Sequence, residues 1–94
     1  MTQRPEIARR VRIAGRVQGV FFRAWAAEQT EALGLCGWVR NRADGSVDAL
    51  LQGKAAAVAR LIEAFHRGPP AARVERVEVD EAEPEPLSGF EVRR

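Results

Sequence analysis

Two segments of helical periodicity, separated by a predicted hairpin, constrain the fold of this chain more than any other feature. In the first segment, four apolar residues and one glutamine recur at helical spacing before Gly34: Phe22, Trp25, Ala26, Gln29 and Leu33. In the second, four apolar residues form one stripe before a Gly-Pro-Pro sequence: Val58, Leu61, Ile62 and Phe65. Glycine and proline are typical of helix ends. We therefore predict two amphipathic helices.

The remaining segments have the alternating pattern of strands. This pattern predicts strands over residues 7–17, 35–41, 47–53 and 77–80, and a short closing strand over residues 90–92. Asp44-Gly45 predicts a tight hairpin turn between the second and third strands. The order strand, helix, strand, strand, helix, strand is that of the ferredoxin-like split βαβ sandwich (βαββαβ), an α+β fold. We expect two helices on one face of a mostly antiparallel sheet.

Length and composition indicate one small domain of 94 residues. We expect a flexible N-terminal tail over residues 1–6 and a single domain over residues 7–94.

The net charge of +2 permits an anionic ligand but does not demand nucleic acid. A single cysteine, Cys36, excludes an internal disulfide and fits a reducing compartment. Because no secretory signal and no apolar run of about 18 residues is present, we expect a cytoplasmic protein outside the membrane.

The loop from Gly15 to Arg23, with the sequence G-R-V-Q-G-V-F-F-R, has the features of a phosphate-binding loop. Its two glycines allow a sharp turn and a close approach to a ligand. The loop leads into the start of a helix, where unpaired amides and the helix dipole attract anions. Arg23 adds a guanidinium group at the same place. A plain strand–helix connection with a solvent-facing arginine is the alternative, because glycine pairs alone are weak signals.

Two motifs in order resemble those of the acylphosphatase family. The first is this loop, and the second is Gly37-Trp38-Val39-Arg40-Asn41, followed by Gly45, Val47 and Gly53. The resemblance covers nearly the whole chain. It implies an acylphosphatase, which hydrolyses the carboxyl–phosphate anhydride bond of small acyl phosphates to a carboxylate and phosphate. Acetyl phosphate, carbamoyl phosphate and 1,3-bisphosphoglycerate are the substrates that it suggests.

The resemblance also implies roles for individual residues. Arg23 would bind the phosphate, and Asn41 would orient the attacking water through its side-chain amide. The residues that would hold the phosphate oxygens, mainly through backbone amides, are Val17, Gln18, Gly19, Val20, Phe21, Phe22 and Arg23. The carboxylate is a good leaving group, so such a reaction relies on positioning and charge stabilisation. We expect no metal, no cofactor and no nucleic-acid partner, and a monomer that acts on a small molecule.

Several of these positions have a second interpretation. Without the resemblance, Asn41 could simply cap the hairpin, where asparagine is common. Phe22 lies on the helix stripe and is expected in the core, whereas Phe21 could wall the site or anchor the loop. Two positions depart from the family pattern, since Ala26 replaces a frequent threonine and Arg42 replaces a small polar residue. Ala26 could weaken the bracing of the loop, and Arg42 could add positive charge near the site or point into solvent.

Other chemistries fit the sequence less well. Cys36 and Arg42 have the C-x5-R spacing of cysteine phosphatases, but a strand would hold them about 20 Å apart. His66, the only histidine, is expected at the surface near a helix end. The acidic run over residues 80–85 is typical of a solvated connector.

Two hypotheses come from other classes of function. An acylphosphatase-like domain can recognise phosphate within a larger protein, as in hydrogenase-maturation proteins that handle carbamoyl phosphate. With no zinc-ligand cysteines and no further domain in the sequence, we expect a stand-alone enzyme instead. Split βαβ sheets can also bind single-stranded RNA through exposed aromatics, but the strands offer only Trp38 and the chain has no tyrosine.

Overall fold

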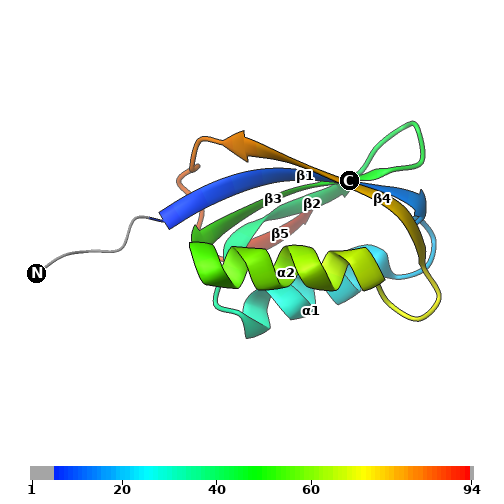
Figure 1. Ribbon diagram of the computed structural model, residues 1–94, viewed down its shortest axis with the longest axis horizontal. Coiled ribbons are helices and arrows are strands. Elements are labelled where there is room, and N and C mark those ends of the chain that lie inside the picture. The colour runs from blue at the N-terminus through cyan, green and yellow to red at the C-terminus, as the bar shows by residue number, and fades with distance from the viewer. Residues whose placement is uncertain (1–5, 94) are drawn as a thin grey trace, which may run out of the picture.

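Two helices cover one face of a five-stranded sheet (Figure 1). The structure is a computed structural model, and it describes residues 6–93. Residues 1–5 of the predicted tail over residues 1–6, and the last residue, Arg94, lie outside the described residues. Glu6, which the sequence analysis assigned to the tail, is already the first residue of the first strand.

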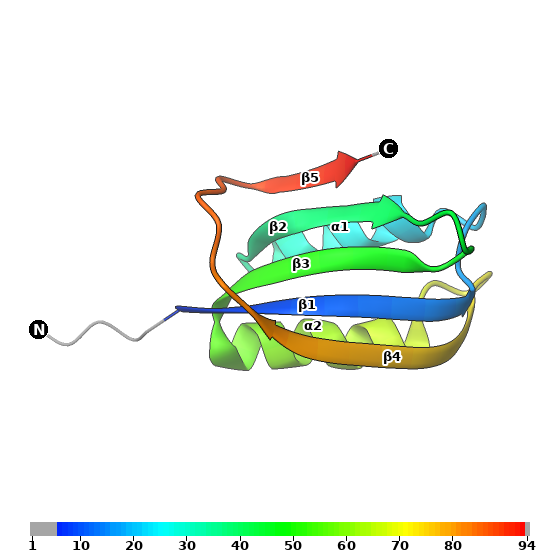
Figure 2. The same ribbon diagram turned by 90° about the horizontal axis from the view of Figure 1, so that it is seen from above.

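The elements follow the predicted order, including the short closing strand. They are β1 (Glu6–Arg16), α1 (Phe22–Ala32), β2 (Cys36–Asn41), β3 (Val47–Lys54), α2 (Ala55–Arg67), β4 (Arg73–Ala82) and β5 (Phe90–Arg93). The sheet order is β4-β1-β3-β2-β5, and neighbours are antiparallel except β2 and β5, which are parallel. The ferredoxin-like fold is therefore confirmed, with the closing strand β5 added beside β2 (Figure 2).

Three strands end at the same side of the sheet. β1 and β2 are both antiparallel to β3 and therefore run in the same direction, and β5 is parallel to β2. Ile13 near the end of β1 and Asn41 at the end of β2 both pair with Val47, the first residue of β3. The loop over residues 17–21 and the hairpin over residues 42–46 consequently meet at one end of the molecule, on the right in Figure 2.

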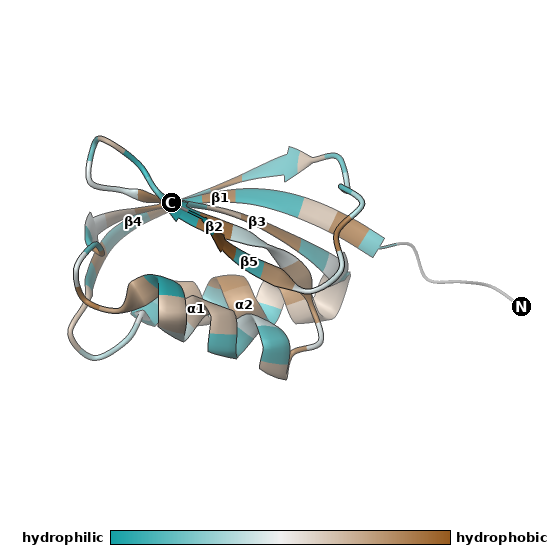
Figure 3. Ribbon diagram, turned by 180° about the vertical axis from the view of Figure 1, so that it is seen from behind, coloured by the Kyte–Doolittle hydropathy of each residue, from teal (hydrophilic) through white to brown (hydrophobic). Residues whose placement is uncertain are grey.

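The main core lies between the sheet and the helices. Each helix carries both apolar and polar residues (Figure 3). Phe22, Trp25 and Phe65 form an aromatic cluster in which the ring centroids lie 5.3, 5.6 and 5.9 Å apart. The predicted stripe of α1 missed one member. Thr30 is fully buried, because its hydroxyl donates to the carbonyl of Ala26 at 2.7 Å and so needs no water.

The other face of the sheet is also covered. We predicted alternating burial in β3, yet residues 47–53 are all buried. Gln52 donates from Nε2 to the carbonyl of Glu85 at 2.7 Å, and its Oε1 accepts from the Glu85 amide at 2.9 Å. Leu87 packs against the buried cluster that contains Trp38. The acidic run is therefore more than a solvated connector, because its last residue fastens the chain across the sheet.

Gly15 allows β1 and β4 to approach each other where β1 turns toward the loop. The register of these two strands shifts between Ala14 and Gly15, which marks a β-bulge. Gly15 has a φ of 126°, and a Cβ at this position would collide with the backbone of Arg73 and Glu75 in β4. Glycine is therefore required here by both the backbone conformation and the space.

We expect Gly15→Ala to lower the free energy of unfolding by about 3 kcal/mol, since it adds a steric collision to an unfavourable φ. Gly34→Ala is the matched control, because Gly34 has a φ of 70° but open space around a Cβ. Gly34→Ala should lower the free energy of unfolding by about 1 kcal/mol. Urea denaturation measures both values, and equal losses in the two variants would contradict the close approach of β1 and β4.

Candidate active site

The start of α1 concentrates unpaired amides and positive charge. Phe21 occupies the N-cap position with a φ of 61° and a ψ of 25°, and it gives the helix no side-chain cap. The first turn of α1 contains no acidic residue, and Arg23 lies within it. Within the described chain, the amides of residues 18–21 donate to no backbone carbonyl. Unpaired amides, a helix dipole and a guanidinium group therefore meet here, which is the arrangement that binds anions.

Arg23 is held in place by the C-terminal strand. Its Nη1 donates to the backbone carbonyl of Arg93 in β5 at 2.9 Å. One of the five N–H groups of the guanidinium is thereby used, and the planar fork is fixed by that contact. The sequence indicated a closing strand but gave no sign that its last described residue fixes Arg23.

Asn41, the last residue of β2, presents an unused hydrogen-bond acceptor. Its Oδ1 is buried, and no donor of the described residues reaches it. The hairpin has another cap, because Asp44 Oδ1 accepts from the amide of Ser46 at 3.0 Å and from its hydroxyl at 2.6 Å. The interpretation of Asn41 as a hairpin cap is therefore wrong. A buried acceptor without a donor is costly, and such an atom needs a specific explanation.

A cavity of about 390 Å³ joins these groups. Its lining contains Val17, Gly19, Phe21, Phe22, Arg23, Ala24, Asn41 and Val92. The two predicted catalytic residues, Arg23 and Asn41, thus share one cavity with part of the predicted loop. Phe22 has its ring in the core and can contribute only through its backbone. Val20 packs against the core and does not line the cavity.

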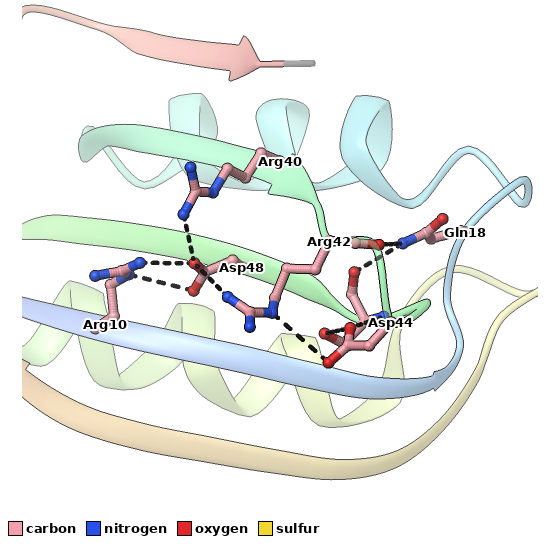
Figure 4. Close-up of polar contacts among 7 residues, drawn as sticks. Arg10, Gln18, Arg40, Arg42, Asp44 and Asp48 are labelled. Atoms are coloured by element: carbon pink, nitrogen blue, oxygen red, sulfur yellow. Dashed lines mark hydrogen bonds and ion pairs between the residues drawn. The ribbon is translucent and has the colours of Figure 1, made fainter.

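Gln18, the remaining residue of the predicted loop, connects the loop to the hairpin. Its Nε2 donates to the carbonyls of Arg42 and Ser46, both at 2.8 Å (Figure 4). The side chain therefore points away from the cavity toward the residues that follow Asn41. These two bonds set the distance between the two halves of the site, the loop and the end of β2.

Beside the site, three arginines surround the carboxylate of Asp48, which is only 1% exposed (Figure 4). Arg10 donates from Nη2 and Nε at 2.7 and 3.2 Å. Arg40 Nη2 lies at 3.4 Å and Arg42 Nη1 at 3.7 Å from Oδ2. Burial alone would raise the pKa of Asp48, but the hydrogen bonds and charges of Arg10 and Arg40 outweigh it and hold that pKa below its usual value. Arg42 therefore faces Asp48 rather than solvent.

Trp38 lies on the same face of the sheet and is only 4% exposed. The guanidinium carbons of Arg10, Arg40 and Arg93 lie 5.1, 5.3 and 4.8 Å from its ring centroid. These are cation–π distances. The ring is therefore covered and offers no free face on which an RNA base could stack.

The other candidate chemistries are not supported by the geometry. Cys36 begins β2, so an extended strand separates it from Arg42, and its Sγ faces the carbonyl of Gln52 at 3.8 Å. His66 is exposed at the end of α2, as predicted. Within residues 6–93, no three His, Cys, Asp or Glu side chains gather as metal ligands. No helix of this same range is long and apolar enough to cross a membrane.

The fold and the site together define an α+β domain in which an uncapped helix start, Arg23 and a facing amide share one cavity. Comparisons with known proteins are specific about the family. Residues 9–92 match the family model of the acylphosphatases. An acylphosphatase of Acidovorax sp. is 56% identical over 87 residues, which are 93% of this chain and 90% of that protein. The chain therefore belongs to the acylphosphatase family and is accordingly a hydrolase.

Solved structures agree with this assignment. The structure of an acylphosphatase from Coxiella burnetii has a TM-score of 0.93 and 39% sequence identity, covering 99% of this chain and 100% of that one. The chain also resembles full-length HypF in its phosphate- and nucleotide-bound form, with a TM-score of 0.85 and 22% identity. That match covers 96% of this chain but 12% of HypF, and at this identity it shows the fold alone.

We expect Gln18→Met to lower kcat/KM for an acyl phosphate by about tenfold, because both bonds between loop and hairpin are lost at nearly unchanged side-chain length. Gln29→Met is the matched control, since Gln29 is half-buried on α1 and outside the cavity lining. Steady-state kinetics at equal folded fraction measure the effect. An unchanged kcat/KM in Gln18→Met would show that the two bonds do not position the site.

The lowered pKa of Asp48 predicts a specific loss of stability in acid. A carboxylate with a folded-state pKa below its unfolded value stabilises the fold above the unfolded pKa, and this contribution is lost as the pH falls through the folded pKa. We expect Asp48→Asn to lower the free energy of unfolding by about 2–4 kcal/mol near neutral pH. This difference from wild type should shrink below about pH 4. Urea unfolding across this pH range measures it, with Glu63→Gln on the exposed face of α2 as control. A difference that is constant with pH would contradict the Asp48 ion pairs.

Proposed function

We propose that this chain hydrolyses the carboxyl–phosphate anhydride bond of small acyl phosphates, with Arg23 as the phosphate clamp and Asn41 as the residue that positions water. One observation carries the proposal: the guanidinium of Arg23, the uncapped start of α1 and the unpaired Oδ1 of Asn41 belong to one cavity. Because one chain supplies both Arg23 and Asn41 to this cavity, we propose that a monomer suffices.

The loop and Arg23 would hold the phosphoryl group. The amides of residues 17–23 would donate to its oxygens, with Arg23 donating from the part of its fork that Arg93 leaves free. These donors also face the charge that spreads over the equatorial oxygens in the transition state. Because they are fixed before the substrate arrives, no further ordering is needed during the reaction.

Asn41 would orient the nucleophile. A water molecule that donates a hydrogen bond to Oδ1 would satisfy this unused acceptor. A lone pair of the water oxygen would then point toward phosphorus. The water oxygen forms a bond to phosphorus while the bond from phosphorus to the carboxylate oxygen breaks. The carboxylate leaves with the bonding electron pair, and its low basicity makes a general acid unnecessary.

The proton released by the water goes to a phosphate oxygen of the product or to solvent. The described lining of the cavity includes no carboxylate, imidazole or thiol that could accept it. Asn41 cannot act as the base, because an amide does not take up a proton near neutral pH. Catalysis in this scheme comes from position and charge rather than from acid–base chemistry.

A phosphate-recognising module without turnover is the second candidate, because the uncapped start of α1 and Arg23 would suffice to hold an anion. The unpaired Oδ1 of Asn41 favours the enzyme over the module. Phosphate recognition needs hydrogen-bond donors around the anion, whereas Oδ1 is an acceptor and can bind a water molecule. Binding of inorganic phosphate without hydrolysis of any acyl phosphate would support the module and overturn the enzyme.

We expect Arg23→Ala and Asn41→Ala each to lower kcat/KM for an acyl phosphate by at least about 10²-fold, the usual effect of removing one transition-state contact. Asn41→Ala should act mainly on kcat, since it removes the water contact and leaves phosphate binding in place. A chelator should have no effect. The exposed Arg60 on α2 provides the control Arg60→Ala, which should keep full activity. Turnover at the wild-type rate in either site variant would refute that residue's role.

A further inference from the structure

Phe21 is placed in a way that the stability of the fold does not explain. Its side chain is 84% exposed, the largest exposure among the exposed large hydrophobic residues of the described chain. It is also the only described non-glycine residue with a positive φ, at 61°. A bulky side chain disfavours this conformation, and an exposed ring gains little from burial. Strain of this kind at the edge of a cavity points to a ligand contact.

Val92 provides a second exposed apolar surface at the same cavity. It lies in β5, next to Arg93, whose carbonyl holds Arg23, and its side chain is 49% exposed. Phe21 and Val92 both line the cavity with Arg23 and Asn41, although they lie near opposite ends of the sequence. The third exposed large hydrophobic residue, Val79, lies on β4 and is not part of the lining.

The chemistry of the cavity is thus divided between two parts. The phosphoryl group has donors in the loop and in Arg23, whereas Phe21 and Val92 offer neither a donor nor a charge to the rest of the substrate. Arg40 and Arg42, which flank Asn41 in the sequence, are directed at Asp48 (Figure 4). A second anionic group on the substrate would therefore meet apolar side chains, and an apolar group would bury them.

We propose that Phe21 and Val92 form an acyl wall, an apolar surface that binds the acyl group of the substrate and makes the site selective for apolar, above all aromatic, acyl phosphates. This inference rests on the proposed function. An aromatic acyl group can stack on the Phe21 ring in an offset or edge-to-face arrangement and bury Val92 as well. Acyl groups as small as a methyl or amino group would gain little from the acyl wall, and a charged acyl group would lose hydration there.

The test compares benzoyl phosphate with acetyl phosphate by the ratio of their kcat/KM values. We expect wild type to favour benzoyl phosphate by about tenfold or more, the usual discrimination of a modest apolar contact. Phe21→Ala should bring this ratio down by about tenfold, mainly through KM of benzoyl phosphate, and Val92→Ala by about threefold. Val79→Ala is the matched control and should leave the ratio unchanged, because Val79 is similarly exposed but distant from the lining.

Phe21→Gly separates a substrate contact from a structural role. Glycine relieves the unfavourable φ, so this variant should have a melting temperature equal to or above that of wild type while losing selectivity as Phe21→Ala does. A selectivity ratio that is unchanged in both Phe21 variants would overturn the acyl wall, as would equal kcat/KM for the two substrates in wild type. Failure of wild type to hydrolyse either substrate would overturn the proposed function itself, and the acyl wall with it.

Discussion

The common direction of β1, β2 and β5 is the constraint on which the site depends. Because β1 and β2 flank β3 in an antiparallel arrangement and β5 is parallel to β2, all three strands deliver their C-terminal ends to one side of the sheet. One end leads into the loop over residues 17–21, one carries Asn41, and one supplies the carbonyl that holds Arg23. Residues distant in sequence therefore meet without any long connection.

The site is built at a cost that the rest of the fold offsets. An arginine in the first turn of an uncapped helix, a phenylalanine with positive φ and a buried amide oxygen without a donor are each unfavourable. The aromatic cluster between α1 and α2 and the buried residues 47–53 of β3 supply compensating burial. Groups that are unfavourable alone but converge on one cavity are what a preorganised anion site requires.

Much of this organisation could be predicted from the sequence. Helical and alternating periodicity gave both helices and the strands, and the two motifs indicated Arg23 and Asn41. The contacts that position these residues could not be read in this way, because a backbone carbonyl such as that of Arg93 carries no sequence signal. The target of Gln18 and the burial of Thr30 depend on strand register and helix rotation, which periodicity leaves undetermined. Likewise, a phenylalanine in a loop gives no sign that its φ is positive.

The central claim is that the loop and Arg23 bind phosphate directly beside Asn41. Its most direct test is a titration of the isotopically labelled protein with inorganic phosphate, followed through the amide resonances by NMR. The account predicts one saturable binding event, with the largest shifts at the backbone amides of residues 17–23 and at the Asn41 side chain. The absence of saturable shifts, or shifts centred on the arginines around Asp48 instead, would contradict it.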